Sequence, residues 1–153
     1  MNNRLEEIRE EYELTKRQLA TILGVSDSIY SRWEHGKDII PTIRIYQLAN
    51  YYKINIDYLL GLSNRKRTIS SPPLPNLQII SRRAREIRAD YHESLRVFSQ
   101  RLNTSNSTWS AYENGRVLIL CAFLIEVCQA GNISADWLLG RTNEKYLQNI
   151  IKV

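Results

Sequence analysis

Four polar side chains fall on one side of a short helix that the sequence predicts over residues 27–35. They are Asp27, Ser28, Ser31 and Arg32. Tyr30 and Trp33 recur three residues apart, and we expect them to pack inward on the other side. The DNA major groove admits a single helix, and its base edges are read by hydrogen bonds. An apolar-backed helix that presents short polar groups and one arginine therefore suits the readout of base edges.

Individual roles follow from the chemistry of these groups. Arg32 is the best candidate for a bidentate contact to guanine, which discriminates against the wrong base by ~1–3 kcal/mol. Asp27 has two interpretations of equal weight. It either accepts a hydrogen bond from cytosine N4, or it stabilises the first turn of its helix through the helix dipole.

The elements that position this face begin at Thr15. Thr15 and Gln18 are spaced as a capping box at the start of a preceding helix. One apolar stripe follows at helical spacing, formed by Leu19, Ala20 and Leu23. Gly24 supplies a left-handed residue that ends this helix, and Ser26 caps the next one. The pattern predicts two short helices joined by a tight turn.

The stretch TKRQLATILGVSDSIYSRWEHGK, with PTIRIYQLANYYKINIDYLLG after it, resembles the helix-turn-helix domain of the phage repressor and Cro family (Xre-type regulators). The resemblance covers about Arg4 to Asn64, and LA…LGVS…WEHGK…P carries it. It implies a lambda-repressor-like, all-α fold and double-stranded DNA as the partner. It also implies phosphate contacts, which position a protein without reading sequence, from Lys16, Arg17, His35, Lys37 and Arg44.

The sequence matches itself without a gap after a shift of 79 positions. RLEEIREEY lies over RAREIRADY, SDSIYSRWEHGK over SNSTWSAYENGR, and INIDYLLGLSN over ISADWLLGRTN. A long period that occurs twice favours tandem domains over a solenoid. We predict two five-helix domains, 1–62 and 77–153, the second with a C-terminal helical tail, joined by a basic, proline-rich linker over 63–76. No stretch alternates with period two, so we expect no sheet.

One charged pair recurs in both halves. Arg9 and Glu34 correspond to Arg88 and Glu113. The family commonly ties its first helix to the end of its third helix through such a pair, so the resemblance implies two structural ion pairs. The alternative is four solvated charges.

The second copy keeps the overall sequence pattern but not all of the candidate base-reading residues, since Ala111 takes the place of Arg32. Its candidate DNA residues are Arg96, Asn106, Ser107, Ser110 and Arg116. The run VLILCAFLIEVC, residues 117–128, is more apolar than one helix face needs, which suggests a buried interface. DNA binding and dimerisation are equally supported for this half, and the two roles are compatible.

The composition fits a polyanionic partner without deciding it. The 153 residues carry a net charge of +5, while five glutamates gather in the first predicted helix: Glu6, Glu7, Glu10, Glu11 and Glu13. No apolar run approaches the ~20 residues of a membrane span, and the charged start does not fit a signal peptide, so we expect a cytoplasmic protein. Cys121 and Cys128 lie seven apart on one helix, too far to bridge, and we expect them in the core.

We therefore expect a sequence-specific regulator of transcription, a repressor, with either both domains on one operator or a homodimer on a palindrome. A protein-interaction module and an antitoxin-type partner protein are the alternatives. An enzyme is disfavoured, because the sequence shows no nucleophile–base set, phosphate-cradling glycine loop or metal spacing. We expect no cofactor and no metal.

Overall fold

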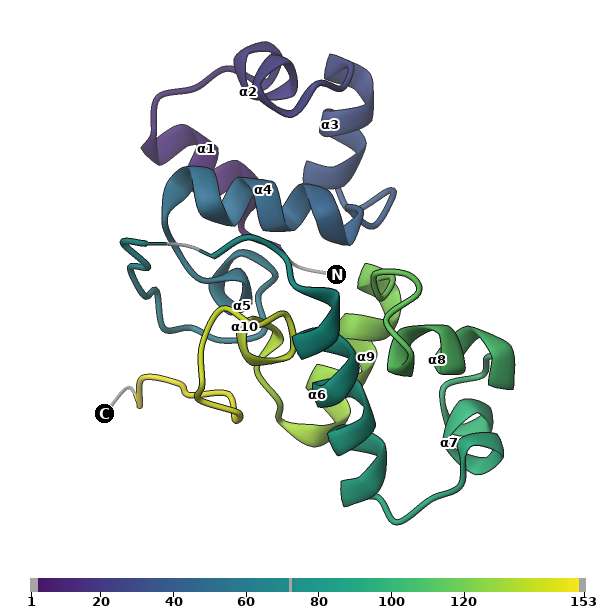
Figure 1. The fold of residues 1–153 in the computed structure, drawn as a ribbon. Coiled ribbons are helices and arrows are strands. Elements are labelled where there is room, and N and C mark those ends of the chain that lie inside the picture. Colours follow the sequence, from purple (N-terminus) through teal and green to yellow (C-terminus); the bar gives the residue numbers. More distant parts are fainter. Residues whose placement is uncertain (1–2, 72, 152–153) are drawn as a thin grey trace. The chain divides into compact units, whose positions relative to one another are not determined.

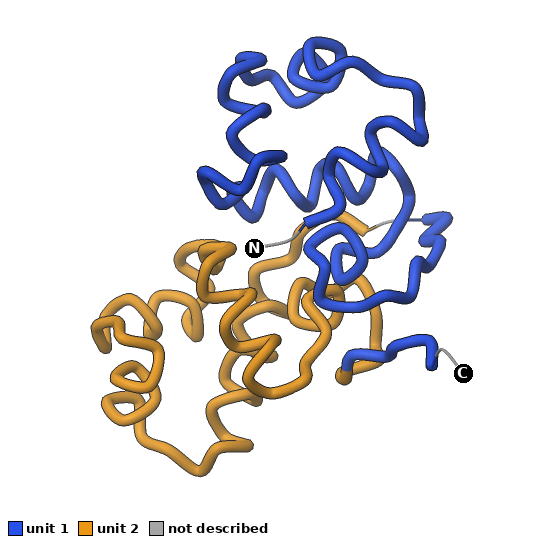
Figure 2. Tube along the Cα trace, turned by 180° about the vertical axis from the view of Figure 1, so that it is seen from behind, with its two compact units in different colours: residues 1–72, 147–153 blue, residues 73–146 orange. Residues whose placement is uncertain are grey.

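The computed structural model describes residues 3–71 and 73–151, and regular structure within them is helical. Two isolated bridges, Ile54 with Thr68 and Ile133 with Tyr146, are the β-pairing in these ranges. The prediction of an all-helical chain without a sheet is confirmed for the described residues. The chain divides into two compact units (Figure 2): Met1–Pro72 with Leu147–Val153, and Pro73–Tyr146.

The described part of the first unit contains five helices (Figure 1): α1 Leu5–Glu11, α2 Lys16–Leu23, α3 Asp27–Glu34, α4 Thr42–Tyr52 and α5 Ile56–Leu59. The ends of α2 and α3 are fixed locally. The Thr15 hydroxyl accepts from the backbone N–H of Gln18, whose side chain accepts from the Thr15 N–H, so the predicted capping box is confirmed. Gly24 ends α2 at a φ of 72°, and Ser26 caps α3.

The core of the first unit is built around α2, which packs against both α3 and α4. Tyr30 has no exposed surface and Trp33 is only 5% exposed, which confirms that α3 turns these rings inward. They pack edge to face with a centroid separation of 6.1 Å. Leu19 and Ala20 of α2 and Leu48 of α4 are also fully buried. The polar side of α3 consequently points away from the core.

The second unit contains α6 Leu77–Asp90, α7 Leu95–Arg101, α8 Asn106–Glu113, α9 Cys121–Gly131 and α10 Ala135–Leu138. The Asn76 side chain accepts from the backbone of Gln78 and Ile79, as expected of a cap for a helix that begins at Leu77. Asn103 adopts the left-handed conformation, with φ 54°, at the position that Gly24 holds in the first unit. Asparagine tolerates this conformation better than most residues, so the second unit forms the same turn with asparagine in place of glycine.

A charge pair joins the first helix of each unit to the end of the third. Arg9 Nε lies 2.5 Å from Glu34 Oε1, and Arg88 Nε lies 2.8 Å from Glu113 Oε2. Each arginine also donates to a carbonyl in the following turn, Arg9 to Leu14 and Arg88 to Glu93. The Glu34 side chain has no exposed surface. Both pairs therefore fix the third helix at one end.

A second arginine in each unit ties the beginning of the unit to its last helix. Arg4 stacks over the Tyr58 ring at 4.1 Å and donates to the carbonyls of Tyr58 and Ser63. Arg83 stacks over Trp137 at 5.1 Å and donates to the carbonyls of Trp137 and Thr142. Burial lowers the pKa of Arg83. The same contact thus closes both units with different aromatic residues.

The predicted C-terminal helical tail is wrong. Among the described residues, the last helix ends at Leu138, and residues 147–151 have no regular secondary structure. The Asn64 side chain donates to the Ile150 carbonyl and accepts from the Ile150 N–H, at 3.0 and 2.7 Å. Ile150 and Ile151 remain 55% and 86% exposed, so a helix here would have no apolar partner surface. Short helices without packing are marginal in water.

The predicted linker over 63–76 is also too long. The Asn55 side chain donates to the Arg65 carbonyl and accepts from the Arg67 N–H, and the Ile69 N–H donates to Lys53. Residues 63–69 therefore belong to the first unit. Asn55 is the residue before α5, but its side chain makes these contacts and no capping hydrogen bond.

Both cysteines are buried and neither forms a disulfide, which confirms the prediction that they lie in the core. Burial raises the pKa of the Cys121 thiol to about 12. Among the described residues, no helix has the length and apolarity needed to cross a membrane.

The two charge pairs predict unequal losses of stability. Glu34→Gln should lower the free energy of unfolding by ~3–5 kcal/mol, the range for a broken buried pair. Glu113→Gln should lower the free energy of unfolding by only ~1–3 kcal/mol. The Arg88 side chain is 28% exposed, against 11% for Arg9, so it remains better hydrated when its partner is lost. Urea unfolding followed by circular dichroism measures both losses.

The matched control is Glu6→Gln, which removes an exposed charge in the first turn of α1. Its effect should stay within ~0.5 kcal/mol. A loss at Glu34 no larger than this control would show that the pair does not hold α3 in place.

Candidate nucleic-acid interface

The polar side of α3 is accessible along its length. Asp27, Ser28 and Arg32 are exposed, and Ser31 is half-buried. The buried rings of Tyr30 and Trp33 fix the rotation of the helix about its axis. The structure therefore brings the four predicted base-reading residues to one accessible side of α3.

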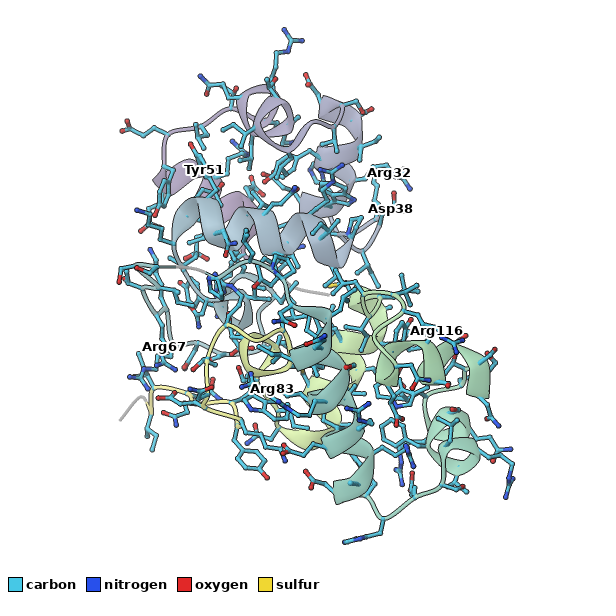
Figure 3. The ribbon with its side chains drawn as sticks, viewed as in Figure 1. Arg32, Asp38, Tyr51, Arg67, Arg83 and Arg116 are labelled. Atoms are coloured by element: carbon cyan, nitrogen blue, oxygen red, sulfur yellow. The ribbon has the colours of Figure 1, made fainter. Side chains whose placement is uncertain are left out.

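Arg32 is held by a carboxylate that follows the helix. Its Nε lies 2.5 Å from Asp38 Oδ2, and its Nη2 lies 3.2 Å from Asp38 Oδ1 (Figure 3). The guanidinium holds the pKa of the Asp38 carboxyl below its ordinary value, and the carboxyl raises the pKa of Arg32. Arg32 is therefore a paired cation at neutral pH.

A second arginine–carboxylate pair spans the turn between α2 and α3. Arg17 Nε donates to Asp27 Oδ2 at 3.0 Å, with both side chains well exposed. This contact adds a third interpretation of Asp27, as a partner that partly neutralises Arg17. Exposed pairs of this kind contribute little to stability, so a phosphate can replace Asp27 as the partner of Arg17.

The remaining predicted phosphate residues lie in two settings. Ser31 Oγ lies 3.3 Å from Lys16 Nζ and 3.2 Å from His35 Nδ1, which links three predicted contact residues across α2 and α3. Lys37 is exposed just after α3. Arg44 is half-buried and donates to the Leu23 carbonyl at 2.7 Å and to the Gln47 side chain at 3.0 Å. Arg44 therefore satisfies the C-terminal end of α2, a role that the sequence did not indicate.

Sequence reasoning missed two residues on this surface. Asp38 was overlooked because its contact depends on the path of the chain after α3. Ile29 is 46% exposed, next to Ser28 on the accessible side of α3. An apolar side chain at such a place suits contact with a thymine methyl group. The sequence carries no clear signal for this exposure, because neighbouring residues of a helix can both be buried, as Ile45 and Tyr46 are on α4.

The second unit presents a sparser version of this surface. Arg96, Asn106, Ser107 and Arg116 are exposed, and Ser110 is half-buried. Ser110 Oγ accepts from the Asn114 side chain at 3.0 Å. Ala111 and Val117 stand 79 residues after Arg32 and Asp38, so both members of that pair are replaced. Arg96 and the neutral Asn106 stand 79 residues after Arg17 and Asp27, so the acid of that pair is replaced by an amide.

A comparison with protein families bears on the first unit. Residues 2–65 match the family model described as a helix-turn-helix domain. The match spans all five helices of that unit. A 61-residue stretch is also 34% identical to the uncharacterized HTH-type transcriptional regulator YobD of Bacillus subtilis (strain 168). The aligned stretch covers 40% of this chain and 54% of the relative, so the chain spans about half the length of that protein. No solved structure matches the chain.

Asp27→Asn separates the interpretations of Asp27. The amide cannot neutralise Arg17, so the affinity for any duplex should rise by about two- to fivefold at low salt, a change of the size expected for an exposed charge pair. Titration of a labelled duplex with each protein, followed by fluorescence anisotropy, measures the change.

A fall in affinity confined to duplexes with a particular cytosine would instead show that Asp27 reads that base. Glu6→Gln is the control, because it removes the same charge from α1.

Proposed function

We propose that this protein is a sequence-specific regulator of transcription that binds double-stranded DNA and inserts α3 of its first unit into the major groove. One observation carries the proposal. The polar side of α3 is accessible while the rings of Tyr30 and Trp33 on its other side are buried, and the helix lies within a stretch that matches helix-turn-helix domains. Arg32 contacts guanine, Ser28 and Ser31 add short hydrogen bonds, and Ile29 contacts a thymine methyl group.

Phosphate contacts would flank the reading helix. Lys16, Arg17 and Lys37 lie at or beside the ends of α2 and α3. The N-terminus of α2 adds backbone N–H groups, which favour an anion. The glutamates of α1 belong to a face turned away from DNA. Arg44 is assigned mainly to the support of α2, because its guanidinium already binds the Leu23 carbonyl.

The second unit is proposed to be a diverged copy of the same domain. Support comes from the same order of five helices, the equivalent charge pair, and the arginine stacked on an aromatic ring. Its third helix lacks a guanine-reading arginine, so its DNA contacts would be to phosphates, through Arg96 and Arg116.

Dimerisation is the second candidate role for this unit. Val117 and Leu120, before α9, are 49% and 59% exposed, and apolar exposure of this kind suits a protein partner. A second copy of the chain would place two first units on a palindromic operator. Such a protein would act as a repressor by occupying the operator.

Binding of a mixed-sequence duplex library should show an enriched motif and a steep salt dependence. Each phosphate contact adds about −0.9 to the slope of log affinity against log salt. Arg32→Ala should lower the affinity for the enriched duplex by about five- to 150-fold, while the slope of log affinity against log salt changes by no more than about one. Anisotropy titrations over ~50–200 mM salt provide both numbers.

Arg82→Ala is the matched control, because Arg82 is an exposed arginine of α6, the first helix of the second unit. It should leave the enriched motif unchanged. Absence of binding at the lowest salt would overturn the proposal and favour a protein-interaction module or an antitoxin-type partner protein.

A further inference from the structure

The chain after α3 folds back onto the helix end and fixes the place of Asp38. The Arg32 carbonyl accepts from the backbone N–H groups of Lys37 and Asp38, at 3.0 and 3.4 Å. Gly36 permits this path with a φ of 70°. The backbone of Asp38 is therefore held against the residue whose side chain its carboxylate contacts.

The contact uses only one edge of the guanidinium. Asp38 takes the edge formed by Nε and Nη2, at 2.5 and 3.2 Å. A guanidinium carries five N–H donors in a planar fork. The edge formed by Nη1 and Nη2 stays available, and it can donate two parallel hydrogen bonds to guanine O6 and N7. One arginine can thus bind the carboxylate and a base at the same time.

The second unit shows that the turn does not need the acid. Gly115 has a φ of 68°, and the Arg116 N–H donates to the Ala111 carbonyl at 3.0 Å, as in the first unit. Val117 nevertheless stands where Asp38 stands. The acid is therefore absent from the copy that lacks the arginine, although that copy makes the same turn. This pattern ties Asp38 to Arg32 and not to the backbone.

Stability offers little reason for the pair. Both side chains are 51% exposed, and exposed ion pairs contribute little to folding. Orientation is a larger effect, because a free arginine side chain loses considerable rotamer freedom when it binds in one geometry. A side chain that is already oriented loses less on binding.

We propose that Asp38 is a positioning residue that orients Arg32 toward guanine and thereby sets the sequence specificity of the first unit. The inference rests on the function proposed above. The carboxylate acts twice: it holds the Nη1–Nη2 edge of Arg32 toward the groove, and its charge repels phosphates when the bases do not match. Both effects widen the difference between specific and non-specific binding.

The test compares discrimination at one base pair. The motif enriched by the unsubstituted chain is compared with that enriched by Arg32→Ala, and the guanine preference that disappears marks the position read by Arg32. Affinities are then measured by anisotropy for the enriched duplex and for one with adenine at that position. The proteins are the unsubstituted chain, Asp38→Asn, Arg32→Ala, the double variant and the control Glu6→Gln.

We expect Asp38→Asn to lower the ratio of the affinity for the enriched duplex to that for the adenine duplex by at least about fivefold. This factor is close to the smallest discrimination that a bidentate base contact typically gives. Its affinity for the adenine duplex should stay equal or rise. In the Arg32→Ala background the same substitution should leave the ratio unchanged. Glu6→Gln should keep the original ratio, and the melting temperature of Asp38→Asn should match that of the unsubstituted protein.

An unchanged ratio in Asp38→Asn, with normal DNA binding and a clear effect of Arg32→Ala, would overturn this inference and leave the proposed function standing. An equal loss in the presence and absence of Arg32 would overturn it as well. Failure of the unsubstituted protein to bind any duplex would overturn the proposed function itself, and with it the inference.

Discussion

The Glu34 carboxylate is removed from water and faces one guanidinium, that of Arg9, at 2.5 Å. Taking both charges out of water is costly, and only close geometry with further hydrogen bonds offsets that cost. Arg9 supplies the bond to the Leu14 carbonyl, which draws the turn before α2 into the same network. Three segments are thereby held together, and α3 has little freedom to move along its axis. The rest of the interface depends on that position.

The orientation of α3 decides which of its residues form the accessible surface. The buried rings of Tyr30 and Trp33 set the rotation of α3, so its polar residues must face outward. The outward side is then shaped by two exposed arginine–carboxylate pairs, which leave its local charge well below what the arginines alone would give. A reading surface of this kind relies on directed hydrogen bonds, while general attraction to the DNA backbone comes from residues at its margin. The buried side chains therefore fix the position of α3, while the two exposed arginine–carboxylate pairs can rearrange when DNA binds.

Local signals predicted most of the first unit. The capping box at Thr15, the left-handed Gly24 and the cap at Ser26 are decided by neighbouring residues, and each is found in the structure. Contacts between distant segments were harder to predict. The partner of Arg32 lies six residues away beyond the end of α3, and the carbonyl bound by Arg44 lies 21 residues away, so helical spacing gives no indication of either. The tail failed for a related reason: periodic apolar residues near Ile150 favour a helix only where a surface exists to cover them.

Contact between DNA and the accessible side of α3 in the first unit can be tested by an NMR titration of the ¹⁵N-labelled 153-residue chain with the enriched duplex, read residue by residue. We expect chemical-shift changes concentrated in residues 15–38, with the amides of α1 nearly unchanged. Shifts confined to α1 or to the second unit, with residues 15–38 unaffected, would contradict it.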